Sequence, residues 1–147
     1  VPALAAFQPD AIVLQCGADA VTEDPLSRLT LSNNAHWDIV AALMTLGCPR
    51  LLVLGGGGYN PWSVGRLWTG VWATLNGNVI PDRLPEPAEA VLRALRWEKP
   101  PQSGRTPPEH WFTTLRDAPR PGSLRPEVAD RIDHLAAQPA ARGQIPE

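Results

Sequence analysis

Two short apolar runs with a helical segment between them constrain the fold more than any other feature of the sequence. The first run, residues 11–15, reads Ala-Ile-Val-Leu-Gln, and the second, Leu51–Leu54, reads Leu-Leu-Val-Leu. Each has the length and composition of a buried β-strand, and each is followed within two residues by glycine. Strands joined through a helix by short links must run parallel. The sequence therefore predicts an α/β fold with a parallel sheet.

Helical spacing of apolar residues follows each of these runs. Residues 33–46 place apolar side chains three and four positions apart, so we predict a helix there, with Asn33 or Asn34 as its N-cap and Gly47 as its stop. After the second run, Pro61 is suited to the first turn of another helix, which we expect to end near residue 76. The order of elements is therefore strand, helix, strand, helix.

The proline content changes near residue 81. Five of the 17 prolines lie before residue 80, and the other twelve lie in the C-terminal part of the chain. We predict that residues 1–80 belong to the α/β domain. Residues 81–147 are then a Pro-rich tail, with short amphipathic helices over 88–97 and 126–137.

The bulk composition excludes some classes of partner. The formal net charge is −2 and the pI about 5.9, so a broad basic surface for direct nucleic-acid binding is not expected. No apolar run approaches the roughly 20 residues that a membrane helix needs. The two cysteines, Cys16 and Cys48, lack metal-site or redox spacing, and we expect unpaired thiols in the cytoplasm. The chain starts at Val1 and enters its first strand almost at once, so we expect a fragment of a longer protein.

Two polar residues follow the predicted strands. Asp19 comes just after the first strand, and Tyr59 follows the second. Ligands of parallel sheets bind at the carboxyl ends of the strands, so both residues should lie at that edge. Asp19 is either a turn or helix-cap acceptor or a functional carboxylate. Tyr59 is either an aromatic cover over the strand ends or a phenol that stabilises a developing oxyanion in an amide hydrolase.

Four consecutive glycines, Gly55–Gly58, lie between the second strand and Tyr59. Such a run is tolerated where another group approaches the backbone closely or where φ is positive. Tight packing and the wall of a substrate channel both remain open as explanations. A nucleotide-binding loop does not fit, because Asn60 stands where the last glycine of that motif is required.

Other polar residues are given structural interpretations. His36, His110 and His134 have no recognisable metal spacing, and we interpret them as solvated or structural. Glu23 and Asp24 precede Pro25, where turn formation is the simpler account.

Several motifs in one order give the sequence a resemblance to a known family. They are Gln15-Cys16-Gly17-Ala18-Asp19, Asp24-Pro25-Leu26, the run from Leu54 through the four glycines to Tyr59-Asn60, and Arg66-Leu67-Trp68-Thr69. Together they resemble the histone deacetylase family over residues 5 to 80. Asn60-Pro61-Trp62 and the later Pro-Arg-Pro-Gly are similar to the bacterial acetoin-utilisation branch. The resemblance implies the C-terminal part of a three-layer α/β/α arginase/deacetylase-like fold.

The resemblance also implies roles for individual residues. Asp19 corresponds to a Zn²⁺ ligand and Tyr59 to the catalytic phenol that polarises the acetamide carbonyl, while Gly57 and Gly58 would line the tunnel for the acetylated lysine. In the family the remaining zinc ligands and a histidine pair precede the first strand, and they are absent here. We therefore expect a zinc-dependent deacetylase that acts on acetyl-lysine in proteins or on small acetylated amines, with this chain inactive alone. The alternative is a non-catalytic interaction module in which Asp19 caps a helix and the Pro-rich tail docks a partner.

Overall fold

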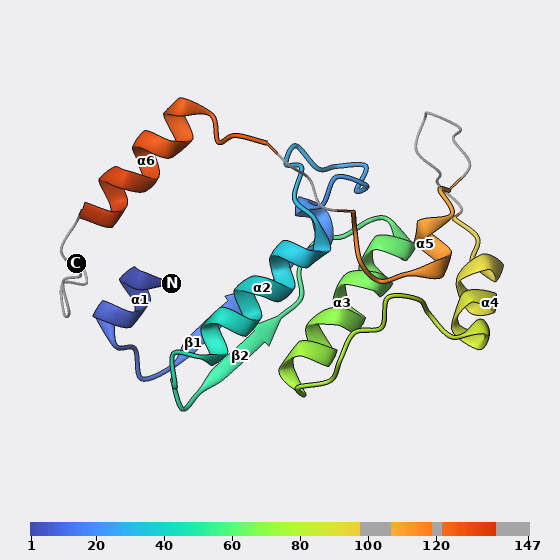
Figure 1. Cartoon of the computed structure of the whole chain (residues 1–147), viewed down its shortest axis with the longest axis horizontal. Coiled ribbons are helices and arrows are strands. Elements are labelled where there is room, and N and C mark those ends of the chain that lie inside the picture. Colours follow the sequence, from blue (N-terminus) through green and yellow to red (C-terminus); the bar gives the residue numbers. More distant parts are fainter. Residues whose placement is uncertain (98–106, 119–121, 138–147) are drawn as a thin grey trace.

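The computed structural model describes residues 1–97, 107–118 and 122–137. Figure 1 shows a small sheet with helices beside it and a C-terminal portion that extends from them. The described elements, in chain order, are α1 (Pro2–Phe7), β1 (Ile12–Gln15), the 3-10 helix η1 (Ala18–Ala20), α2 (Asn33–Met44), β2 (Leu51–Leu54), α3 (Pro61–Leu75), α4 (Glu86–Ala94), α5 (His110–Thr113) and α6 (Pro126–Ala137). None of the described helices is long and apolar enough to cross a membrane.

The two predicted strands form a parallel pair, as expected. Ile12 lies opposite Leu51, and Gln15 lies opposite Leu54. Because the register is unshifted over all four residues, both strands end at the same level. The loops that follow them therefore start side by side at one edge of the sheet.

Only one face of this pair is covered by the described residues. Leu14 and Val53 pack against the hydrophobic core, whereas Val13 and Leu52, on the opposite face, are 65% and 54% exposed. In the view of Figure 1, helix α2 lies in front of β1 and runs along β2. The prediction of buried strands thus holds for one face of the pair, and the other face is exposed among the described residues.

The helices after each strand form as predicted, with corrections at both ends of α2. This helix ends at Met44 with Thr45 as its C-cap, before the predicted stop at Gly47. Ser32, rather than Asn33 or Asn34, is the N-cap of α2, and its side chain accepts a hydrogen bond from the amide of Ala35. In α3, Pro61 occupies the first turn, as expected, and the Asn60 side chain caps the helix. The asparagines at the start of α2 are used in long-range contacts instead.

Helices α2 and α3 pack closely through an aromatic residue and a glycine. The Trp37 indole of α2 donates a hydrogen bond to the carbonyl of Leu67 in α3. A Cβ at Gly70 would lie 2.0 Å from the Trp37 ring, so the indole occupies the space that a side chain would take. Val40, Leu67 and Val71 are fully buried around this contact. This packing is the centre of the hydrophobic core.

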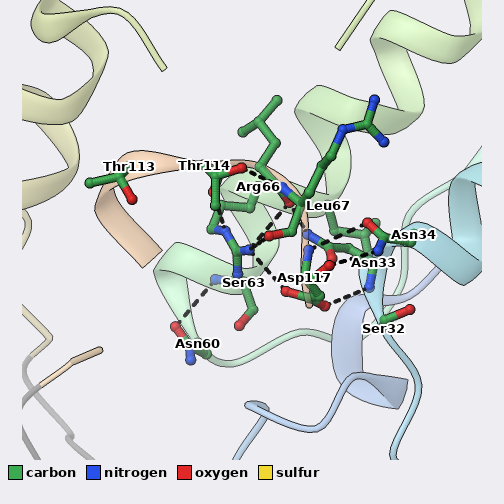
Figure 2. Close-up of polar contacts among 12 residues, drawn as sticks. Ser32, Asn33, Asn34, Asn60, Ser63, Arg66, Leu67, Thr113, Thr114 and Asp117 are labelled. Carbon is green, nitrogen blue, oxygen red and sulfur yellow. Dashed lines mark hydrogen bonds and ion pairs between the residues drawn. The ribbon is translucent and has the colours of Figure 1, made fainter. Parts of the chain in front are cut away.

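A buried polar cluster joins residues 114–117 to α2 and α3 (Figure 2). The Arg66 guanidinium, 1% exposed, donates to the carbonyls of Thr114 and Arg116 and pairs with Asp117 at 2.9 Å. Asp117 also accepts the backbone N–H of Asn33 at 2.9 Å. We call Arg66, Asp117, Asn33 and Asn34 the Arg66–Asp117 cluster. It fixes a distant segment against the start of α2.

The C-terminal helices differ in part from the prediction. Helix α4 spans Glu86–Ala94 rather than 88–97, because Leu95 is already extended with ψ 142°. Helix α6 has the predicted bounds, whereas α5 has only four residues and was not predicted. The division between residues 80 and 81 stays a prediction, and Pro119–Pro121 lie outside the described residues.

Candidate active site

Backbone hydrogen bonds continue from the sheet into the two loops that follow it. The amide of Cys16 donates to the carbonyl of Leu54 at 2.8 Å, and the amide of Ala18 donates to the carbonyl of Gly57 at 2.7 Å. These bonds hold the loop after β1 against the loop after β2. The Asp19-bearing helix η1 is thereby placed beside the four glycines.

Asp19 is exposed, and its carboxylate lies directly against Gly57. A Cβ at Gly57 would be 2.0 Å from Asp19 Oδ2 and 2.4 Å from Cγ. No side chain caps η1, whose N-cap is Gly17, so the cap role considered for Asp19 is not observed. The structure therefore brings two of the predicted site residues, Asp19 and Gly57, into contact.

The four glycines serve two kinds of close approach. A Cβ at Gly55 would meet the Trp68 ring at 3.3 Å, and one at Gly58 would lie 2.7 Å from Val64, so these two positions pack against α3. A Cβ at Gly56 would lie 1.9 Å from the side-chain Nε2 of Gln15, while Gly57 faces Asp19. Close packing, one of the two explanations, is thus found at both α3-facing positions. The role of Gly57 and Gly58 as tunnel walls stays a prediction.

Tyr59 follows Gly58, which has φ +143°, a value that side-chain-bearing residues rarely adopt. The Tyr59 side chain is 52% exposed. Its backbone N–H donates to Asp24 Oδ2 at 2.6 Å. Tyr59 thus lies two residues after Gly57, the glycine that contacts the Asp19 carboxylate, at the predicted edge of the sheet.

Asp24 has a wider role than the turn expected from the sequence. Its Oδ1 accepts the N–H of Leu26 at 2.9 Å, which is the predicted turn, but its Oδ2 reaches Tyr59, 35 positions along the chain. In parallel, the Asn60 side chain donates to the carbonyl of Glu23 at 3.0 Å. Sequence spacing could not reveal these bonds, since they depend on how the two loops meet. Gln15, whose amide lies against Gly56, was missed for the same reason.

One group among the described residues has potential metal-binding geometry, and it does not include Asp19. The ligand atoms of Glu23, His110 and Asp117 lie within 4.8 Å of one another. Asp117 already bonds Arg66 and the Asn33 amide, and the Arg66 cation beside it opposes a divalent ion. The sequence did not predict this group, because its members come from separate segments. We interpret it as part of the structural contacts around the Arg66–Asp117 cluster.

A catalytic Zn²⁺ takes three protein ligands. At the carboxyl edge of β1 and β2, the described residues provide the Asp19 carboxylate and no group of three that includes it. The donor set in these residues therefore does not complete a zinc site.

The cysteines are unpaired, as predicted. Cys16 is 3% exposed, and burial raises the pKa of its thiol above the ordinary value of 9.0. Cys48 is partly buried, and its thiol lies 3.4 Å from the carbonyls of Pro9 and Arg50. Neither thiol belongs to the potential metal-binding group.

Known proteins are similar to this chain in sequence and in fold. Residues 1–75 match the family model for the histone deacetylase domain. A putative histone deacetylase 2 from Caenorhabditis elegans is 46% identical over 79 residues, which is 54% of this chain and 15% of the worm protein. Histone deacetylase 9 of Arabidopsis thaliana is 42% identical over 80 residues, or 18% of its length. The chain thus spans less than a fifth of these two relatives.

The solved structure of an HDAC homologue from Aquifex aeolicus superposes with a TM-score of 0.75 and 29% identity, covering 92% of this chain and 38% of the homologue. A structure of an HDAC homologue complexed with SAHA matches equally well, at 28% identity. The α/β arrangement with its small parallel sheet is accordingly that of the arginase/deacetylase fold. The family model covers half of the chain, and the chain belongs to the histone deacetylase family.

Proposed function

We propose that this chain forms part of the active site of a zinc-dependent deacetylase, with Asp19 as a metal ligand and Tyr59 as the catalytic phenol. The observation that carries the proposal is the placement of the Asp19 carboxylate against Gly57, on loops that also carry Tyr59. A carboxylate that ligates a metal and a phenol that donates to a carbonyl oxygen have to act on the same group of the substrate. Both residues follow neighbouring parallel strands at one sheet edge, which meets this requirement.

The substrate would be acetyl-lysine in proteins or a related small acetylated amine. A lysine side chain is long and narrow, and the backbone of Gly57 and Gly58 would form part of the wall beside it, while the side-chain space at these two positions is taken by Asp19 and Val64. Tyr59 would donate a hydrogen bond from its hydroxyl to the acetamide oxygen as negative charge develops there. The homologue complexed with SAHA supports a deacetylase site in this fold.

Zinc would act as a Lewis acid that polarises the acetamide carbonyl and activates water. Asp19 would hold one side of the ion, and the remaining ligands have to come from residues outside those described here. We accordingly propose that these 147 residues alone are inactive and correspond to the C-terminal part of a complete three-layer domain. Membership of the acetoin-utilisation branch and a cytoplasmic location belong to the same proposal.

The test is hydrolysis of an acetyl-lysine peptide by a full-length protein that contains residues 1–147. We expect turnover that is lost on chelation and restored by added Zn²⁺, and no turnover by residues 1–147 alone. A chimera that carries this chain in place of the equivalent portion of the Aquifex aeolicus homologue provides a second measurement. Metal-free full-length protein with undiminished turnover would contradict the proposal, as would an inactive full-length protein together with an inactive chimera.

A further inference from the structure

The Asp24 side chain links the loop after β1 to the backbone of Tyr59. Asp24 is 5% exposed, and each of its carboxylate oxygens accepts a different backbone amide. Oδ1 binds Leu26 within its own loop, and Oδ2 binds Tyr59 across the gap between the loops. A buried carboxylate with two backbone donors is held firmly, since neither oxygen can leave its donor without leaving that donor unpaired.

Tyr59 depends on its backbone for orientation more than a core aromatic residue would. Its side chain is 52% exposed, so packing restrains the ring only in part. The preceding Gly58 adopts φ +143°, and the following Asn60 is fully buried and caps α3. The amide of Tyr59 lies between these two fixed residues, and Asp24 is the partner that holds it.

We propose that Asp24 is a positioning residue, which holds the Tyr59 backbone so that the phenol keeps a fixed position relative to the carboxylate of Asp19. The inference rests on the proposed function, because it assigns Asp24 a role through Tyr59. Asp24 itself touches neither substrate nor metal in this account. Its effect is to keep two loops that both contribute to the reaction at a fixed separation.

Other contacts hold the loops together without Asp24, so its loss can be separated from unfolding. The Cys16 to Leu54 and Ala18 to Gly57 backbone bonds do not involve Asp24. The Asn60 side chain to Glu23 carbonyl bond is likewise independent of it. An Asp24→Asn variant keeps the side-chain volume but has a single acceptor oxygen, so its amide group must face one of the two N–H donors. We expect the oxygen to stay on Leu26, two residues away in the local turn, which turns the NH₂ group toward the Tyr59 amide. The loop pairing should persist while the Tyr59 amide loses its partner.

The experiment compares Asp24→Asn, Tyr59→Phe and the double variant in the full-length protein, with an acetyl-lysine peptide as substrate. Asp117→Asn is the matched control, because Asp117 is also 5% exposed and accepts a hydrogen bond from a backbone N–H, that of Asn33. Unlike Asp24, Asp117 belongs to the Arg66–Asp117 cluster and does not contact Tyr59 in the bonds given above. A misplacement of about 1 Å can cost about 100-fold in rate, so we expect Asp24→Asn to lower kcat by roughly 10- to 100-fold. KM and bound zinc should stay unchanged.

Two further readouts distinguish positioning from a purely structural role. The double variant should be no slower than Tyr59→Phe alone, because Asp24 acts through the phenol that is already missing. Hydrogen exchange at the Tyr59 amide should be faster in Asp24→Asn and unchanged in Asp117→Asn. Should Asp24→Asn fail to fold, Asp24→Ser retains a short acceptor for the local turn and replaces it in every comparison.

Several results would overturn the inference. They are a kcat within threefold of wild type in Asp24→Asn, multiplied losses in the double variant, or an equal fall in kcat in Asp117→Asn. Each of these leaves the proposed function intact so long as Tyr59→Phe is impaired. Wild-type turnover in Tyr59→Phe, by contrast, refutes the proposed role of Tyr59 and the role of Asp24 with it.

Discussion

Substitution of Gly57 by alanine would place a methyl group where the Asp19 carboxylate now lies. The new Cβ would be 2.0 Å from Oδ2, whereas ordinary contact begins at 3.4 Å. Oδ2 must therefore retreat by roughly 1.4 Å. Rotation of the exposed Asp19 side chain moves Oδ2 and Cγ away, but its Cβ, 2.9 Å from the new methyl group, moves only with the backbone. The expected loss of folding stability is therefore about 1–3 kcal/mol, the scale of overpacking.

The displacement should weaken metal binding as well as folding. Ligand positions in a metal site are fixed to within about 0.2 Å, and the displacement exceeds this several-fold. We expect zinc affinity in the full-length protein to fall at least about 100-fold, the upper end of the loss seen when only a ligand's supporting contact is removed. Turnover of an acetyl-lysine peptide at limiting zinc should fall in proportion.

The assay measures bound zinc per protein by elemental analysis, peptide turnover, and the free energy of unfolding in urea. Gly65→Ala is the matched control, because Gly65 lies within α3 and a Cβ there would meet nothing within 4 Å. We expect that control to retain zinc and turnover and to gain up to about 1 kcal/mol in stability from helix propensity. Full zinc occupancy in Gly57→Ala at limiting zinc would refute the placement of Asp19 as a ligand against this glycine.

Three further predictions concern the structural core. Arg66→Met removes the cation from a buried pair whose side chains are 1% and 3% exposed, so the free energy of unfolding in urea should fall by about 3–5 kcal/mol. A fall below about 1 kcal/mol would show that the Arg66–Asp117 cluster does not hold residues 114–117 in place. Gly70→Ala forces a methyl group into the Trp37 ring and should lower the free energy of unfolding by about 1–3 kcal/mol through overpacking. The near-UV circular dichroism of Trp37 should change as well. Unchanged stability and an unchanged spectrum would contradict the α2–α3 contact. Burial raises the pKa of Cys16, so iodoacetamide should label this thiol at pH 8 only after unfolding, as peptide mass spectrometry can measure. The contribution of this thiol to stability should be complete below the pKa of the unfolded thiol and be lost as the pH rises toward the raised folded value.

The order of strands and helices could be predicted from local patterns. The apolar run at Leu51–Leu54 and the proline at position 61 each act through neighbours in sequence, and both predictions are confirmed. The N-cap of α2 was wrong by one residue, because Asn33 is drawn into contacts with residues 115 and 117 that the local pattern does not show. The short helices α1 and α5 carry too few residues to give a period.

The site was predictable in position but not in its connections. Asp19 and Tyr59 follow directly from the strand ends, since parallel strands place their carboxyl ends at one edge. The bond of Asp24 to Tyr59 and the close approach of the Gln15 side chain to Gly56 depend on side-chain directions and on how two segments about 35 to 40 residues apart meet. Asp24-Pro25 predicts a turn correctly, yet a turn uses only one of the two carboxylate oxygens. The hydrogen-bond partner of the second oxygen, the Tyr59 amide, lies 35 positions away and cannot be predicted from the local sequence.

The most direct test of the account is a paired measurement of bound zinc and turnover for Asp19→Ala and Tyr59→Phe in the full-length protein. If the carboxylate binds the metal and the phenol acts on the substrate, Asp19→Ala should lose both zinc and turnover. Tyr59→Phe should keep its zinc and lose turnover by about 100-fold or more, the scale of removing one oxyanion donor. Full zinc occupancy in Asp19→Ala, or undiminished turnover in Tyr59→Phe, would contradict the account.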